Sequence, residues 1–155
     1  MRGIEIPKFR ALSSGLKTFD ELFGAGGFCE WETKNNHLIQ LQITDEPGFM
    51  WHEGDKNILI RPIKDNVTAE DVAPYEIIEF PGGIFLVAAC DENDNSDLEE
   101  TVNCMRTWIK NSGVFEYGDF PNSGMCNMPN VGGAFDTALG IAQQQIFLPL
   151  KLRTK

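Results

Sequence analysis

The strongest hydrophobic pattern in the chain lies between Asp97 and Asn111, where apolar residues recur every three or four positions. This spacing places them on one face of a helix, because an α-helix completes a turn in about 3.6 residues. The face consists of Leu98, Val102, Met105 and Ile109. Ser96 and Glu99 have the spacing of a capping box at the start, and Gly113 is suited to the end. We therefore predict a helix here, and we expect Trp108 to belong to the core because it borders the apolar face.

Four segments have the composition and partial alternation of β-strands. They are 4–16, a hairpin formed by 49–53 and 58–63 around a loop at 54–57, then 75–90, and finally 139–152. Pro7 interrupts the first segment and Pro81-Gly82-Gly83 bends the third. Proline cannot donate a hydrogen bond to a neighbouring strand, and glycine in a strand often marks a kink or bulge. The polar segment 65–74 is predicted to be a loop.

The region between the first strand and the hairpin has weaker signals. Thr18 and Glu21 have the spacing of a capping box, but Gly24 follows soon after, so the helix they start is short. The run from Gly24 to Gly27 lacks the spacing of a phosphate-binding loop, and we interpret it as a helix stop. The segment 31–42 is ambiguous, and the partial alternation from His37 onward favours a strand.

One short motif occurs twice in the chain. Ile60-Arg61-Pro62-Ile63-Lys64 is echoed by Phe147-Leu148-Pro149-Leu150-Lys151, each after an apolar run. Coincidence between two strand ends is one explanation. The other is a duplication, with pseudo-repeat halves of about 1–70 and 75–152 inside a single domain, 1–155. Each half then reads strand, helix, strand, strand, which predicts an α+β fold with an antiparallel sheet, helices on one side and a small-molecule cleft between the halves.

Composition narrows the class of protein. The chain has 155 residues, 42% of them hydrophobic and 23% charged, which is typical of one soluble globular domain. The formal net charge is −10. Proteins that grip DNA or RNA need a basic face to neutralise phosphates, so we expect no direct nucleic-acid contact. The same charge argues against docking on anionic membranes.

The N-terminal residues and the cysteines indicate a compartment. The start of the chain lacks the apolar core of a signal peptide, and no apolar run is long enough to span a bilayer. The four cysteines are Cys29, Cys90, Cys104 and Cys126, with no C-x-x-C spacing. We therefore expect a cytoplasmic protein with reduced thiols.

Motifs for catalysis or metal binding are weak. His52-Glu53 has no second histidine at helical spacing, and the acidic loop Asp91–Asn95 lacks the pattern of an EF-hand. Scattered histidines and cysteines that assemble in space remain an alternative, as does a Cys–His nucleophile pair. We predict no catalytic residues, no metal and no cofactor.

Three segments resemble the gyrase-inhibitor-like (GyrI-like) domain, the effector-binding domain of many AraC-type and MerR-type bacterial transcription regulators. The first is Tyr75–Val87, which is similar to the central strand of that domain. The others are the helix from Asp97 to Asn111 and the terminal Gln145–Lys151. The resemblance covers about 75–151 well and is thinner before, where Ile6–Arg10 is similar to the opening strand.

The resemblance implies a duplicated fold with a ligand cleft, and it directs attention to one position. In the family, a Glu four residues before the proline of the last strand commonly receives cationic ligands. Here that position is Gln145, which carries no charge. The implied ligand is therefore neutral or hydrogen-bonding, with an aromatic or apolar body. Gln143 and Phe147 share the strand face of Gln145, because alternate residues point the same way.

Aromatic residues supply further candidates for the pocket, although for any one of them the core is the alternative. Trp51 and Phe147 lie on strands that would border the cleft, and Phe85 and Tyr117 are also available. Glu53 shares a strand face with Trp51 and could replace the missing acid.

Three functions are compatible with these features. The first is an effector-binding module for transcription regulation, whose DNA-binding domain or partner lies outside this chain. The second is a freestanding protein that sequesters a ligand or inhibits another protein. The third is a small-molecule hydrolase with Glu53 as general base, although we expect no enzyme. A homodimer is compatible with all three.

Overall fold

The computed structural model describes residues 1–40, 48–128 and 133–154, and the described residues form two compact units. Residues 1–7, 82–128 and 133–154 belong to one unit, which we call the α3 unit, and residues 8–40 and 48–81 belong to the other, the α1–α2 unit. The chain crosses between them after Pro7 and after Pro81. Both crossings fall at the strand breaks expected from the sequence.

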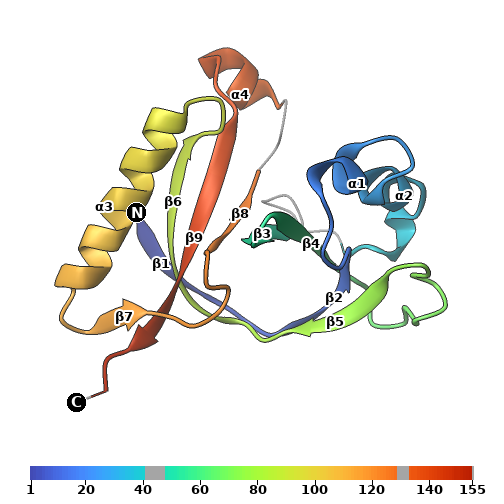
Figure 1. Cartoon of the computed structure of the whole chain (residues 1–155), viewed down its shortest axis with the longest axis horizontal. Helices are drawn as coiled ribbons and strands as arrows, with labels where there is room; N and C mark the ends of the chain where they lie inside the picture. Colours follow the sequence, from blue (N-terminus) through green and yellow to red (C-terminus); the bar gives the residue numbers. More distant parts are fainter. Residues whose placement is uncertain (41–47, 129–132, 155) are drawn as a thin grey trace. The chain divides into compact units, whose positions relative to one another are not determined.

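The α3 unit is an antiparallel sheet with two helices (Figure 1). Its strands follow the order β1 (Arg2–Ile6), β6 (Gly83–Asp91), β9 (Gln143–Leu152) and β8 (Met125–Asn127). A further short strand, β7 (Phe115–Tyr117), also pairs with β9. The helices are α3 (Asn95–Asn111) and α4 (Ala134–Leu139). No helix of the described residues is both long enough and apolar enough to cross a membrane.

The strands of the α1–α2 unit are also antiparallel. They follow the order β3 (Phe49–Glu53), β4 (Lys56–Pro62), β2 (Phe9–Ser13) and β5 (Glu76–Phe80). Two short helices, α1 (Phe19–Phe23) and α2 (Phe28–Lys34), precede a 3-10 turn, η1 (Asn36–Leu38). Together the units confirm the predicted α+β class with antiparallel strands and few helices.

In each unit one face of the strands packs against helices, which are α3 in one unit and α1 and α2 in the other. Under α3, alternate residues of β6 and β9 form a buried cluster with the apolar helix face, composed of Leu86, Cys90, Met105, Ile109, Ile146, Leu148 and Leu150. In the other unit, Leu12 and Leu59 pack with Leu22 of α1 and Phe28 of α2. The alternate residues of these strands point to the opposite face, away from α3 in one unit and away from α1 and α2 in the other.

Several local predictions are confirmed. Thr18 and Glu21 exchange both bonds of a capping box at the start of α1, and Gly24 ends that helix. The β3–β4 hairpin pairs Glu53 with Lys56 around its turn. The long third strand is broken between Phe80 and Gly83, where β5 ends and β6 begins.

Others are wrong. The ambiguous segment begins with the end of α2, and His37 and Leu38, where a strand was favoured, lie in a 3-10 turn. Ile39 forms an isolated antiparallel bridge with Ile63, and residues 41 and 42 lie outside the described residues. Side chains of α2 contact partners that are distant in the sequence. Trp31 lies 5.1 Å from Tyr75 between ring centroids, and Glu32 pairs with buried Arg61 at 2.9 Å.

Two predictions about α3 also need correction. Its N-cap is Asp94, whose carboxylate accepts hydrogen bonds from the backbone N–H groups of Ser96 and Asp97. Ser96 therefore lies inside the helix and does not cap it. Trp108 is 40% exposed and stacks on Phe115, so it does not belong to the core.

The cap assignment can be tested by two alanine substitutions. Asp94→Ala removes the acceptor for two helix N–H groups and should cost about 1 kcal/mol of unfolding free energy. For a chain of this size that lowers the melting temperature by about 2–4 °C. Ser96→Ala should leave the melting temperature within about 1 °C. A larger loss in Ser96→Ala than in Asp94→Ala, measured by thermal circular dichroism, would restore the capping box at Ser96.

Candidate functional site

The face of the α3-unit sheet that points away from α3 carries several of the residues singled out from the sequence. The β6–β9 register places Val87 opposite Phe147, Ala89 opposite Gln145 and Asp91 opposite Gln143. Residues directly opposite each other in an antiparallel pair share a face of the sheet. Strand β8 extends the same face on the other side of β9. We call this surface the Gln145 face, and it comprises Phe85, Val87, Ala89, Asp91, Met125, Asn127, Gln143, Gln145, Phe147 and Pro149.

The Gln145 face changes from apolar to polar along its strands. At the apolar end, Phe85, Phe147 and Met125 are all buried. At the polar end, Gln143 and Gln145 are half-buried. The arrangement offers hydrogen-bonding groups beside a closely packed apolar surface, which is the usual composition of a small-molecule site.

Gln143 is held by a buried carboxylate from α4. Its side-chain Nε2 donates to Asp136 Oδ1 at 2.8 Å, and its backbone N–H donates to Asp136 Oδ2 at 3.4 Å. Gly140 has φ +71° and lets the chain turn back from α4 toward β9. Asp136 uses one N–H of the Gln143 side chain, so its second N–H and its carbonyl oxygen remain for another hydrogen-bond partner.

Asn127 contributes an acceptor that has no donor. The residue is 8% exposed, and its side-chain Oδ1 is buried without a hydrogen-bond partner among the described residues. It lies directly opposite Gln145 in the β8–β9 pair. A buried carbonyl without a partner costs about 1–3 kcal/mol, so such groups are rare in folded proteins.

Sequence reasoning identified neither Asn127 nor Asp136. Asn127 follows an irregular stretch, and only the register shows that it faces the same way as Gln145. Asp136 lies on α4, a helix that was not predicted, so its hydrogen bond with Gln143 could not be predicted from the sequence.

Trp51 and Glu53 lie in the α1–α2 unit. Trp51 is 3% exposed, and its Nε1 donates to the exposed carboxylate of Glu53 at 3.2 Å. The Trp51 ring also lies 6.4 Å from Phe80 between centroids, within an aromatic cluster completed by Phe9 and Phe49. This cluster is on the sheet face that α1 and α2 leave uncovered.

Tyr117 lies on the other side of the α3-unit sheet from Gln145. It is paired with Leu150 and packs with the cluster under α3. Burial raises the pKa of its phenol. The structure thus gathers Gln143, Gln145, Phe147 and Phe85 on one face. It does not bring Tyr117 to them, because Tyr117 pairs with Leu150, which faces α3.

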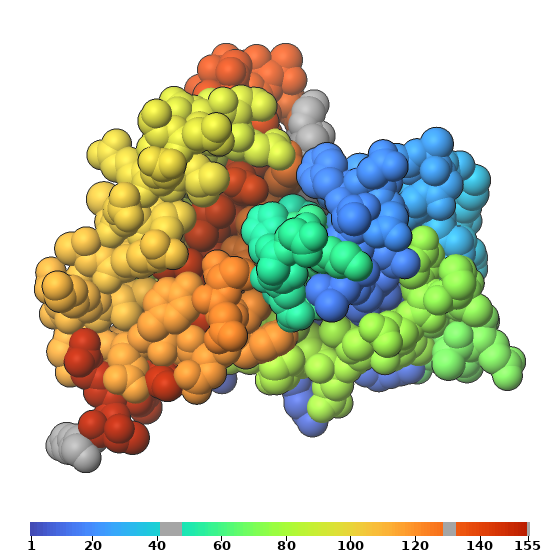
Figure 2. Space-filling view, viewed as in Figure 1, coloured from blue at the N-terminus to red at the C-terminus, as the bar shows by residue number. Residues whose placement is uncertain are grey.

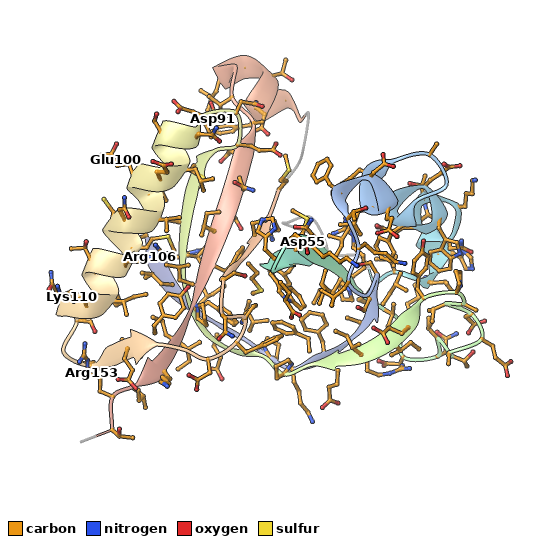
Figure 3. The ribbon with its side chains drawn as sticks, viewed as in Figure 1. Asp55, Asp91, Glu100, Arg106, Lys110 and Arg153 are labelled. Atoms are coloured by element: carbon orange, nitrogen blue, oxygen red, sulfur yellow. The ribbon has the colours of Figure 1, made fainter. Side chains whose placement is uncertain are left out.

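The acidic residues at the start of α3 have structural roles. Asp97 Oδ2 accepts from the backbone N–H of Asp91 at 2.8 Å, and Asp91 Oδ1 accepts from the backbone N–H of Asn93 at 3.0 Å. Figure 3 shows Asp91 at the end of β6 beside the start of α3. A hollow of about 530 Å³ lies here, with Gln143 in its wall. No group of three or more metal-ligating side chains occurs among the residues that the structure describes.

Cys90 is buried and lines the same hollow as Asp91. Burial raises the pKa of its thiol, and the negative charges of Asp97 and Asp91 raise it further. A thiol with a raised pKa is a poor nucleophile at neutral pH. Cys104 is exposed on the outer surface of α3, which Figure 2 shows in yellow and light orange.

Comparisons with known proteins agree with this fold. No family model matches the sequence, and the curated proteins give no significant match. Among solved structures, the chain is similar to SAV2435 bound to tetraphenylphosphonium, with 13% identity, a TM-score of 0.52, and coverage of 97% of this chain and 93% of that one. It is also similar to the EcmrR C-terminal domain, with 12% identity, a TM-score of 0.60, and coverage of 97% and 96%.

Two further neighbours add context. In the EcmrR–DNA complex, the match has 12% identity and a TM-score of 0.65, and it covers 97% of this chain but 56% of the EcmrR chain. A hydrolase from Listeria innocua matches with 12% identity, a TM-score of 0.61, and coverage of 97% and 91%. At these identities the likeness shows the fold alone, which this chain shares with ligand-binding, DNA-associated and hydrolase proteins.

The unpaired Asn127 oxygen makes a prediction about stability. Asn127→Leu replaces the amide with an apolar group of similar size and should raise the unfolding free energy by about 1 kcal/mol. Asn127→Asp should lower it by more than that, because a buried carboxylate without a cation is costly. Urea denaturation of the wild type and both variants measures their unfolding free energies and so ranks their stabilities. A Leu variant less stable than the wild type by over 1 kcal/mol would mean that the amide is satisfied in the free protein.

Proposed function

We propose that this chain is a GyrI-like effector-binding domain, which binds a small molecule on the Gln145 face and senses it for bacterial transcription regulation. The observation that carries the proposal is the position of Gln145. It stands half-buried between the apolar end of the face at Phe147 and the acceptors of Asn127 and Gln143. That is a place where a bound molecule can lose water from its apolar part and keep polar contacts.

The comparisons support the proposal at the level of fold. SAV2435 has been solved with tetraphenylphosphonium, and the EcmrR C-terminal domain belongs to a protein solved in complex with DNA. This chain spans 56% of that EcmrR chain. By analogy, a DNA-binding domain or partner protein would lie outside the present residues. The net charge of −10 fits a domain that does not itself contact DNA.

The ligand is proposed to be neutral. Where the family commonly has Glu, this chain has Gln145, and an amide offers hydrogen bonds but no charge. An aromatic or apolar body suits the buried side chains of Phe85, Phe147 and Met125. Trp51, Glu53 and Tyr117 stay predictions as ligand contacts.

We favour binding over catalysis, although a hydrolase is among the structural neighbours. Glu53, the first candidate for a general base, is exposed and accepts a hydrogen bond from Trp51 on its own strand. A carboxylate in open solvent lacks the burial that usually tunes a catalytic base. A freestanding protein that sequesters the same ligand would use the same face.

A thermal-shift screen tests the proposal, because a ligand that binds only the folded state raises the melting temperature. The panel contains neutral aromatic compounds, lipophilic cations and polar metabolites at fixed protein concentration. We expect a shift of several degrees with neutral aromatic compounds, abolished in Gln145→Leu.

The matched control is Gln144→Leu, on the same strand but paired with Cys90 on the helix-facing side. It should keep the full shift. Loss of the shift in both variants would mean an effect on folding, and a shift that survives in Gln145→Leu would move binding to another surface.

A further inference from the structure

Asn127 is the polar group on the Gln145 face whose hydrogen-bonding capacity is least used. Its Oδ1 is buried and has no partner among the described residues, while the backbone of its strand is paired with β9. We infer that the ligand of this face donates a hydrogen bond to Asn127 Oδ1, which makes it an aromatic molecule with an N–H or O–H group. This inference rests on the proposed function and specifies its ligand chemistry.

The register places Asn127 beside Gln145. The two residues are direct partners in the antiparallel β8–β9 pair, so their Cβ atoms are about 4.5–5.5 Å apart. Gln143 is the diagonal neighbour of Asn127, at about 7–8 Å. Three amide side chains therefore lie within the span of one small aromatic compound.

The polarity of these amides favours a ligand that donates. Asp136 accepts from Gln143 Nε2 at 2.8 Å, which leaves the Gln143 carbonyl oxygen and its second N–H for another partner. Asn127 also presents its carbonyl. Two acceptors therefore flank Gln145, whose own amide can either donate or accept.

The neighbouring side chains define the rest of the molecule. Met125 precedes Asn127 by two residues on β8 and lies opposite Phe147. Both are 3% exposed, so the strand positions next to the acceptors are closely packed and apolar. An aromatic ring suits this environment, and burial strengthens a hydrogen bond made at its edge.

A ligand with a donor group gives Asn127 Oδ1 the hydrogen bond that it lacks in the free protein, whereas a ligand without one leaves this oxygen unpaired. That penalty is the basis on which a binding site rejects an analogue that lacks an N–H or O–H group. We therefore expect the site to discriminate between two molecules that differ only by methylation of their donor.

Indole and 1-methylindole are such a pair, and tetraphenylphosphonium serves as a cationic probe without donors. Dissociation constants for all three are measured by NMR titration of the whole chain. We expect indole to bind at least about tenfold more tightly than 1-methylindole, which corresponds to one hydrogen bond of about 1.4 kcal/mol. Asn127→Leu should remove this preference, and Gln144→Leu should keep it.

The outcomes separate this inference from the proposed function. Equal binding of indole and 1-methylindole, or a preference that persists in Asn127→Leu, would overturn the role of Asn127 while leaving a binding face at Gln145. Tighter binding of tetraphenylphosphonium than of indole would also overturn it. Failure of all three probes to bind would count against the proposed function itself and remove the inference with it.

Discussion

The pairing of β6 with β9 is the interaction on which the candidate site depends. It runs without a break from Ile84 opposite Leu150 to Asp91 opposite Gln143. Side chains alternate along a strand, so this register decides which residues lie under α3 and which form the Gln145 face. A shift by one residue would place Gln145 against the helix and Leu148 on the other face. The apolar cluster of α3 therefore fixes the Gln145 face indirectly, because burial of Leu86, Ile146 and Leu148 holds the register.

The Gln145 face combines two demands that oppose each other. Core packing favours apolar residues at Phe147 and Met125, whereas Asn127 places an unpaired carbonyl beside them. That carbonyl lowers the stability of the free protein and contributes to folding only when a donor reaches it. Local conflicts of this kind are typical of binding sites, where a residue is retained for the bound state. Asp136 has the complementary role, because it orients Gln143 from a helix outside the sheet.

Patterns that depend on nearby residues could be predicted from the sequence. The face of α3, the breaks at Pro7 and Pro81, and the shared face of Gln143, Gln145 and Phe147 all follow from local periodicity. The N-cap of α3 could not be predicted in this way. Asp94 and Ser96 are both suitable caps, and the choice between them depends on how the chain leaves β6. At the end of β6, the backbone N–H of Asp91 donates a hydrogen bond to the side chain of Asp97. Asn127 and Tyr117 could not be assigned to a face, because short strands in an irregular segment take their register from β9.

Side-chain amide NMR tests the central claim most directly. The chain is labelled with ¹⁵N at asparagine and glutamine, and the strongest neutral compound from the thermal screen is added. The account predicts that the side-chain NH₂ signals of Gln143, Gln145 and Asn127 shift together, whereas that of Gln144 on the helix-facing side does not. Shifts centred on Gln144, or binding that moves none of the three amides, would contradict the assignment of the ligand to the Gln145 face.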